Sequence, residues 1–147
     1  MKIIVDANIV FSGILNTKGK IGDLLINSEN HFEFISPDFL RVEIYKHHKK
    51  LSKISGLSLN EVRESERLIC REIKFISEDQ ISNLIWEKSI KLVDDVDPKD
   101  APYVAFAKNF KCKIWSGDKQ LIKGLAKKGF DNFISTEELF KTREQRR

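Results

Sequence analysis

Four acidic residues stand at positions where folding could gather them into one site. Asp6 ends the apolar run at residues 3–5, and Asp118 follows the apolar segment at residues 114–115. Two residues of helical segments complete the set, Glu43 and Asp100. Converging carboxylates repel one another unless a cation neutralises them, and such hard oxygen ligands favour Mg²⁺ or Mn²⁺. An acidic, metal-holding pocket on a basic protein suggests phosphodiester chemistry.

The hydrophobic pattern predicts short strands separated by helices. Strands are expected at residues 2–5, 32–36, 74–76, 113–116 and 133–135. Strands that alternate with helices imply right-handed crossovers, and hence an α/β fold with a mostly parallel sheet covered on both faces. In such sheets the ligand site lies at the carboxyl ends of the strands, where Asp6 and Asp118 both fall.

Two of the expected helices are defined by their apolar spacing. The segment 37–51 predicts one continuous helix that starts at Pro37 and carries Glu43, because proline is tolerated in a first helical turn. The segment 79–92 predicts a helix whose buried positions are Ile81, Leu84, Ile85 and Ile90. These helices would flank the sheet and place Glu43 near its edge.

Each carboxylate also has an ordinary structural role open to it. Asp6 and Asp118 could each cap the helix that follows its strand. Glu43 could lie on a solvated helix face, paired with Arg41 or Lys46 at helical spacing. None of these residues is diagnostic alone, and it is their joint placement that indicates a shared metal site.

The segment 94–100 holds more acid than a helix start requires, with aspartate at residues 94, 95, 97 and 100. One or two of these suffice to stabilise the positive end of a helix. Asp97 and Asp100 lie three residues apart and share one side of the first turn. Asp100 is the better ligand candidate, whereas Asp97 is expected to be the cap, with a supporting position beside the metal.

Length and composition indicate one cytoplasmic domain. The chain has 147 residues, a net charge of +4, and two distant cysteines without metal-ligand spacing. Nothing resembles a signal peptide, and no apolar segment approaches the roughly 20 residues of a membrane span. We expect a single domain at residues 1–140, followed by a frayed basic tail at residues 141–147.

Four short segments keep the order and spacing of a known family: residues 5–10, Glu43, residues 97–107 and residues 114–121. Together they resemble the PIN-domain nucleases, and in particular the toxin components of toxin–antitoxin systems. The likeness extends from Met1 to about Leu139. Two positions depart from it, because Ala7 stands where the family often has threonine, and Gly117 where it often has asparagine.

The resemblance implies a metal-dependent endoribonuclease with a three-layer α/β/α sandwich. It implies that one or two Mg²⁺ or Mn²⁺ ions bind to the acidic quartet Asp6, Glu43, Asp100 and Asp118. In this scheme a bound ion activates water for in-line attack on phosphorus. Asn8 and Ser116 match polar positions beside the site. The family further implies an RNA substrate, a homodimer and a small antitoxin partner.

Basic residues near the acidic set could attract the RNA backbone. Lys46 belongs to a basic cluster at residues 46–50, and Lys119 and Lys123 follow Asp118. An ordinary solvated helix face explains these lysines equally well.

Two other functions are open to the same residues. A PIN-like module without catalytic activity could bind RNA or another partner, although the intact quartet argues against lost activity. A phosphatase or acyl-phosphate switch would need one nucleophilic aspartate with helper residues on later strands, and it leaves Glu43 unexplained.

Overall fold

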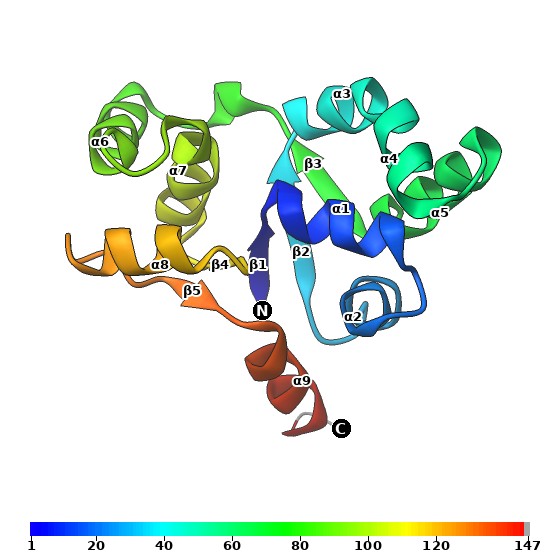
Figure 1. The fold of residues 1–147 in the computed structure, drawn as a ribbon. Helices are drawn as coiled ribbons and strands as arrows, with labels where there is room; N and C mark the ends of the chain where they lie inside the picture. Colours follow the sequence, from blue (N-terminus) through cyan, green and yellow to red (C-terminus); the bar gives the residue numbers. More distant parts are fainter. Residues whose placement is uncertain (146–147) are drawn as a thin grey trace.

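The computed structural model describes residues 1–145, which form one central parallel sheet flanked by helices (Figure 1). Within these residues the sheet consists of β1 (Lys2–Val5), β2 (Glu33–Pro37), β3 (Ile73–Ile76), β4 (Lys113–Trp115) and β5 (Phe133–Ile134). Each pairing is parallel and the spatial order is β3-β2-β1-β4-β5. The predicted α/β class with a parallel sheet is therefore confirmed.

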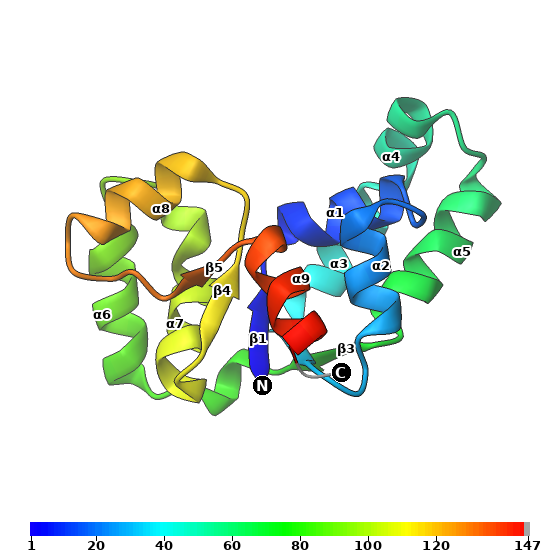
Figure 2. The same cartoon turned by 90° about the horizontal axis from the view of Figure 1, so that it is seen from below.

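Helices pack on both faces of the sheet and give three layers (Figure 2). One layer contains α1 (Ala7–Leu15), α2 (Lys20–Asn27), α3 (Phe39–Lys46), α4 (His48–Ser55), α5 (Leu59–Cys70) and α9 (Thr136–Gln145). The other contains α6 (Asn83–Val93), α7 (Ala101–Phe110) and α8 (Lys119–Ala126). Two 3₁₀ turns, Glu78–Gln80 and Pro98–Asp100, precede α6 and α7.

The central strand β1 is buried on both faces because successive side chains of a strand point in opposite directions. Ile3 and Val5 pack into the apolar cluster of the first layer, and Ile4 packs into that of the second. All three are fully buried. The continuous apolar run is thus the pattern of a central parallel strand, and it brings Asp6 to the middle of the sheet edge.

β1 is the central strand, and the later strands are added first on one side of it and then on the other. Residues 7–76 add β2 and β3 on one side, and residues 77–134 add β4 and β5 on the other. A crevice opens at the carboxyl ends of the strands where the order reverses in this way.

The prediction of one helix at residues 37–51 is wrong. Pro37 ends β2, α3 begins at Phe39, and the helix breaks at His47 before α4. At the break the backbone N–H of His47 donates to carbonyl oxygens of the last turn of α3. The turn redirects the chain so that α4 packs against α5.

The predicted buried set of the helix at residues 79–92 is only partly correct. Ile81 is buried, but Leu84 and Ile90 are 60% and 52% exposed. The 3₁₀ turn delays the start of α6 to Asn83, and the helix then packs Ser89 and Val93 inward. Ser89 tolerates burial because its hydroxyl donates to the carbonyl oxygen of Ile85 at 2.8 Å.

The expectation of a frayed tail is wrong for residues 141–145, which belong to α9. Arg143 is 5% exposed and donates hydrogen bonds to Ser28 and to Asp23 of α2 at 3.1 and 3.0 Å. The last two predicted tail residues, Arg146 and Arg147, lie outside the described residues. None of the described helices has the length and apolar character needed to cross a membrane.

Candidate active site

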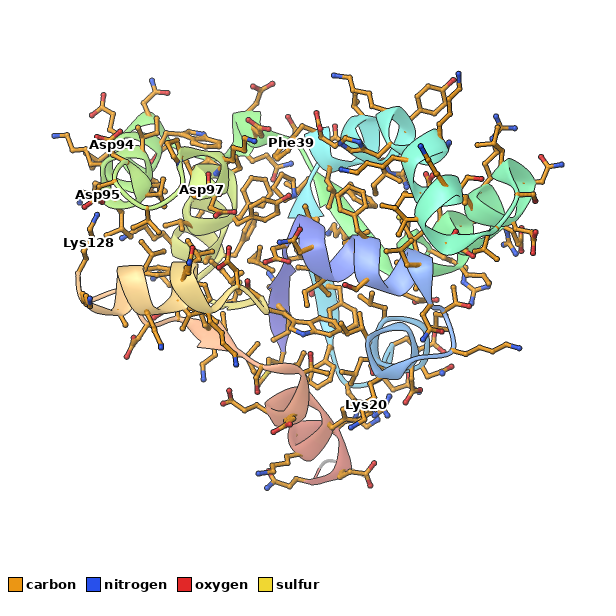
Figure 3. The ribbon with its side chains drawn as sticks, viewed as in Figure 1. Lys20, Phe39, Asp94, Asp95, Asp97 and Lys128 are labelled. Carbon is orange, nitrogen blue, oxygen red and sulfur yellow. The ribbon has the colours of Figure 1, made fainter. Side chains whose placement is uncertain are left out.

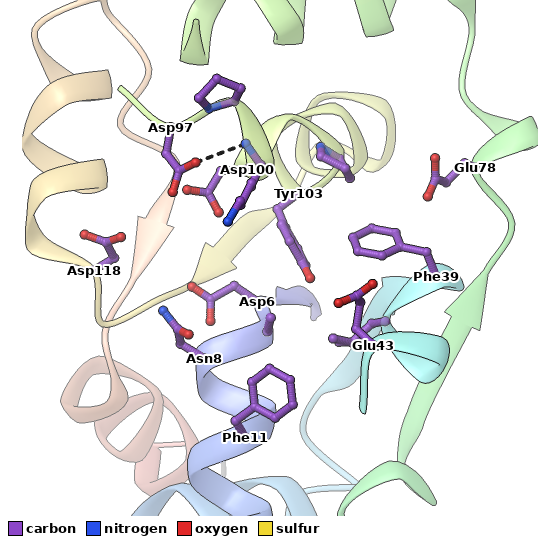
Figure 4. Close-up of a pocket in the computed structure, with 15 residues that line it drawn as sticks. Asp6, Asn8, Phe11, Phe39, Glu43, Glu78, Asp97, Asp100, Tyr103 and Asp118 are labelled. Carbon is purple, nitrogen blue, oxygen red and sulfur yellow. Dashed lines mark hydrogen bonds between the residues drawn. The ribbon is translucent and has the colours of Figure 1, made fainter. Parts of the chain in front are cut away.

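The four predicted carboxylates line a single cavity of about 620 Å³ at the carboxyl ends of the strands (Figure 4). We call it the acidic cavity. Asp6 and Glu43 enter from the half of the chain before residue 77, and Asp100 and Asp118 from the half after it. Residues distant in sequence thus meet where the strand order reverses.

Asp6 occupies the centre of the acidic cavity and is almost entirely buried, at 4% exposure. It follows β1 directly and caps α1, because its carboxylate accepts the backbone N–H of Ile9 at 2.9 Å. Burial raises the pKa of this carboxyl, and the Asp118 carboxylate adds to the rise. Hydrogen bonding from Ser116 and Ile9 acts in the opposite direction. The capping role and a place in the cavity are therefore compatible.

Asp118 reaches the acidic cavity from the loop between β4 and α8. Its side chain caps α8 by accepting the backbone N–H of Leu121 at 3.1 Å. The Ser116 hydroxyl accepts the backbone N–H of Asp118 at 3.1 Å, so a polar residue braces this loop. A side chain at Gly117 would meet no other atom within 4 Å, which leaves this side of the loop open.

Asp97 is the cap that the sequence predicted, whereas the side chain of Asp100 is left for the cavity. Asp97 caps the 3₁₀ turn by accepting the backbone N–H of Lys99 at 3.1 Å, the bond drawn in Figure 4. Asp100 makes no capping bond and faces the other carboxylates. Burial raises the pKa of Asp100 to about 7, helped by repulsion first from Asp97 and then from Asp6 and Asp118.

The aspartates of residues 94–100 that do not line the acidic cavity lie at the end of α6 (Figure 3). Asp95 forms an ion pair with Lys128, which also donates to the backbone carbonyl oxygen of Leu92 at 2.8 Å. This contact fastens the end of α6 to the end of α8. Asp94 and Asp95 are absent from the cavity lining, so only two of the four aspartates in this segment reach it.

Glu43 lies at the boundary between the acidic cavity and solvent. It lines the acidic cavity, yet its side chain is 41% exposed. Its carboxylate lies 3.9 Å from the ammonium of Lys46 and 3.7 Å from the ring of His47. The cation near Glu43 is therefore Lys46, as the helical spacing suggested. Lys119 and Lys123 are exposed on α8 and do not line the cavity.

The residues of the acidic cavity that the sequence did not predict include a further carboxylate, Glu78, together with Tyr103, Lys99 and Phe39. Tyr103 is 4% exposed, and its hydroxyl points toward Asp6 and Glu43 with no hydrogen-bond partner among the described residues (Figure 4). Lys99 supplies a cation to the lining, and Phe39 forms an apolar part of the wall. Tyr103 lies three residues after Asp100 on α7, so helical spacing could have indicated its position.

The electrostatics of Tyr103 make it a neutral donor. Burial raises the pKa of the phenol far above its ordinary value, and the carboxylates of Asp6, Asp100 and Glu43 raise it further. The backbone N–H of Ala7 acts in the opposite direction but is not placed for a full hydrogen bond. The cavity therefore contains one buried O–H group directed at a cluster of negative charge.

The donor chemistry of the cavity suits a hard divalent cation. Six carboxylate side chains line it, the four predicted ones together with Asp97 and Glu78, and burial and charge repulsion raise the pKa values of Asp6 and Asp100. A bound cation would favour the ionised form of these two carboxylates. Within residues 1–145, however, no three histidine, cysteine, aspartate or glutamate side chains are grouped closely enough to hold an ion. The carboxylates share a cavity without forming a ready-made coordination shell.

Comparison with protein-family models decides the family. The model described as PIN domain matches residues 4–142, nearly the whole chain. This chain belongs to the PIN-domain family. A search of curated proteins found no match.

Membership of the PIN-domain family agrees with the geometry of the site. The matched segment contains the end of β1, strands β2 to β5 and every lining residue of the acidic cavity. It supports a nuclease-type function in general, since PIN domains are typically metal-dependent nucleases. In this PIN domain the strand that opens the matched segment also delivers Asp6 to the cavity.

Proposed function

We propose that this protein is an endoribonuclease that cleaves RNA phosphodiester bonds with the help of Mg²⁺ or Mn²⁺. The observation that carries the proposal is the convergence of Asp6, Glu43, Asp100 and Asp118 on one cavity of a PIN domain. A divalent cation would supply activated water and charge stabilisation at phosphorus. The carboxylates would hold that cation.

The residues of the cavity have distinct roles in this proposal. Asp6 and Asp118 are the firmest ligands because each is anchored at a strand end by its own capping bond. Asp100 completes the set, and Glu43 orients water or contacts a second ion. Asp97, Asn8 and Ser116 position the ligands: Asp97 fixes the turn before Asp100, and Ser116 braces the loop of Asp118.

Tyr103 extends this set as a donor to the substrate. Its phenol stays protonated at neutral pH, and a phosphate oxygen in the cavity would accept the O–H group that lacks a partner. This hydrogen bond would orient the phosphodiester against the carboxylates. Lys99 supplies a further positive charge for the backbone.

The sheet order argues against a phospho-acceptor switch. Flavodoxin-like proteins, which include such switches, have the strand order 2-1-3-4-5. This chain has β3-β2-β1-β4-β5, with Glu43 in the cavity. A nuclease uses this fourth carboxylate, whereas an acyl-phosphate mechanism has no role for it.

The partners follow from the resemblance rather than from a contact in the structure. We propose that the nuclease is the toxin of a toxin–antitoxin pair, acts as a homodimer in the cytoplasm, and is silenced by a small antitoxin. A small protein encoded beside it that binds it and stops RNA cleavage would support this. If co-expression with every adjacent small protein leaves cleavage unchanged, the toxin assignment is wrong.

The experiment that tests the nuclease assignment replaces Asp6 with asparagine. Asparagine caps a helix as well as aspartate does, so Asp6→Asn should keep the fold while removing the charge. We expect RNA cleavage in Mn²⁺ to fall by about 100-fold or more, with loss of Mn²⁺ binding in calorimetry. Asp131→Asn, the same change at an exposed site outside the cavity, is the matched control.

Each outcome of this experiment separates the candidate functions. Undiminished cleavage by Asp6→Asn would show that the acidic cavity is not the active site. RNA binding by the wild-type protein without Mn²⁺-dependent cleavage would favour the non-catalytic module.

A further inference from the structure

A second cavity, of about 510 Å³, lies among α3, α4 and α5 and is lined by arginines. We call it the arginine cavity. Its guanidinium groups come from Arg41 on α3 and from three residues at or just beyond α5, Arg63, Arg67 and Arg71. No sequence motif or family feature described above assigns it a role.

Helix α3 forms a wall between the arginine cavity and the acidic cavity. Arg41 and Tyr45 are four residues apart, so they share one face of the helix, and both line the arginine cavity. Glu43 is two residues from each and therefore points to the opposite side, into the acidic cavity. The two cavities are separated by about 10 Å, the diameter of one helix.

The positive charge of the arginine cavity is only partly compensated. Arg67 pairs with Glu64 at 2.5 Å, and Arg71 pairs with Glu72 at 3.3 Å. Arg41 and Arg63 make no ion pair within residues 1–145.

The carboxylate that lines the arginine cavity is already engaged. One oxygen of Glu66 contacts the ring of the largely buried His48, and within residues 1–145 Glu66 forms no ion pair with Arg41 or Arg63. Arg41 lies over the ring of Phe75 at 4.6 Å, a cation–π contact that favours this orientation of the guanidinium. Two guanidinium groups, one of them pre-oriented, therefore have unused hydrogen-bond donors.

An exposed aromatic side chain completes the arrangement. Tyr45 is 70% exposed at the rim of the arginine cavity, and its ring lies 5.3 Å from the His48 ring. The contact with His48 holds the Tyr45 ring in place while leaving much of it open to solvent. Aromatic rings beside cationic grooves are the general means by which proteins hold single-stranded nucleic acids.

We propose that the arginine cavity binds the backbone of single-stranded RNA, with one base stacked on Tyr45. This inference rests on the proposed nuclease function, since it places the cavity one helix away from the site of cleavage. Guanidinium groups match phosphate oxygens in geometry and charge. An acidic peptide would also satisfy the arginines, but the open face of Tyr45 and the shared wall α3 favour an RNA strand that continues from the acidic cavity.

Binding to a fluorescent single-stranded RNA tests the proposal, with the full-length protein in EDTA so that cleavage does not interfere. We expect Arg63→Gln to weaken binding and to reduce the slope of log affinity against log salt by about 0.7, the value for one lost phosphate contact. Lys53→Gln removes the same charge from an exposed residue of α4 that lies outside the basic cluster at residues 46–50 and does not line the cavity, and it is the matched control.

The stacking contact is tested separately. Tyr45→Ala should weaken RNA binding by about fivefold or more, whereas Tyr45→Phe should leave it unchanged because the ring remains. With metal present, Arg63→Gln and Tyr45→Ala should raise KM for a long RNA without changing kcat. Cleavage of a dinucleotide, which is too short to cross α3, should be unaffected.

The outcomes distinguish this proposal from the nuclease assignment. Unchanged RNA affinity in Arg63→Gln and Tyr45→Ala, or equal losses in Arg63→Gln and Lys53→Gln, would overturn the arginine cavity as an RNA site. Failure of the wild-type protein to bind RNA would overturn it as well. Binding that depends on Arg63 and Tyr45 without any metal-dependent cleavage would support this inference and refute the nuclease function.

Discussion

The hydroxyl of Ser36 donates a 2.7 Å hydrogen bond to the backbone carbonyl oxygen of Val5, the residue before Asp6. Ser36 is fully buried near the end of β2, so this bond joins two strand ends beneath the acidic cavity. A side chain without catalytic chemistry thereby helps to hold the backbone that carries Asp6.

Replacement of Ser36 by alanine should lower the free energy of unfolding by about 1–2 kcal/mol, because the hydrogen bond to Val5 is lost in a buried place. Urea denaturation measures the effect. Ser12→Ala, at an exposed position of α1, should change stability by less than about 0.5 kcal/mol. Equal stability of both variants would mean that the Ser36 bond contributes nothing.

Tyr103→Phe should lower RNA cleavage without lowering the stability of the fold. Removing a buried hydroxyl without a partner should leave the free energy of unfolding unchanged or raise it by about 1 kcal/mol. Cleavage of RNA should nevertheless fall by about tenfold to a hundredfold, the worth of one hydrogen bond to a charged group. Tyr45→Phe is the control for cleavage. A destabilised Tyr103→Phe with normal activity would indicate a structural hydroxyl instead.

The raised pKa of Asp100 predicts how stability depends on pH in metal-free protein. Asp100 holds its proton up to about pH 7 in the folded state, whereas its ordinary value is 3.8. The folded state thus binds more protons between these values, so this contribution to stability is lost as pH rises from about 4 through 7. Thermal unfolding in EDTA at a series of pH values should show the decline.

Two variants identify the source of this pH dependence. Asp100→Asn should flatten the profile, because no proton remains to be lost. Asp97→Asn should shift the decline to lower pH, since it removes the largest charge repulsion on Asp100 and asparagine keeps the cap. Added Mn²⁺ should stabilise the wild-type protein most above pH 7, where the carboxylates are ionised. A profile that Asp100→Asn does not alter would assign the effect to another group.

Arg143 should prove essential to the attachment of α9. Arg143→Ala removes the hydrogen bonds to Ser28 and Asp23 and leaves the fully buried Ser28 hydroxyl without its donor. We expect a loss of about 2 kcal/mol or more in the free energy of unfolding. Lys141→Ala, an exposed change on the same helix, should cost little. Comparable values for the two variants would count against an anchoring role.

The strand ends were predictable because their signals are local. The β-branched run before Asp6 and the short strand before Asp118 each specify a buried parallel strand, and a carboxylate after such a strand falls at the ligand edge. The capping roles of Asp6, Asp97 and Asp118 also follow from neighbouring backbone groups. The separation of Asp97 from Asp100 could therefore be argued from sequence.

The missed features depend on contacts between distant segments. The break at His47 allows α4 to pack on α5. The apolar spacing of residues 37–51 does not indicate this packing. Helix α6 packs against α7 with Ser89 and Val93 buried and Leu84 exposed, an orientation that depends on the distant partner helix. Tyr103 was not predicted as a site residue, because its missing hydrogen bond is visible only once the cavity is assembled from distant segments.

The reversal of strand order at β1 makes the acidic cavity a junction between two contiguous halves of the chain. Residues 1–76 bring Asp6 and Glu43, and residues 77–145 bring Asp100 and Asp118, so neither half holds the full set. Helix α9 contacts α2, and Arg143 donates a hydrogen bond to Asp23 of that helix. The last helix thus connects the second half of the chain to the first. Two separately produced fragments, divided near Ser77, would bring all four carboxylates together only if they reassembled around β1.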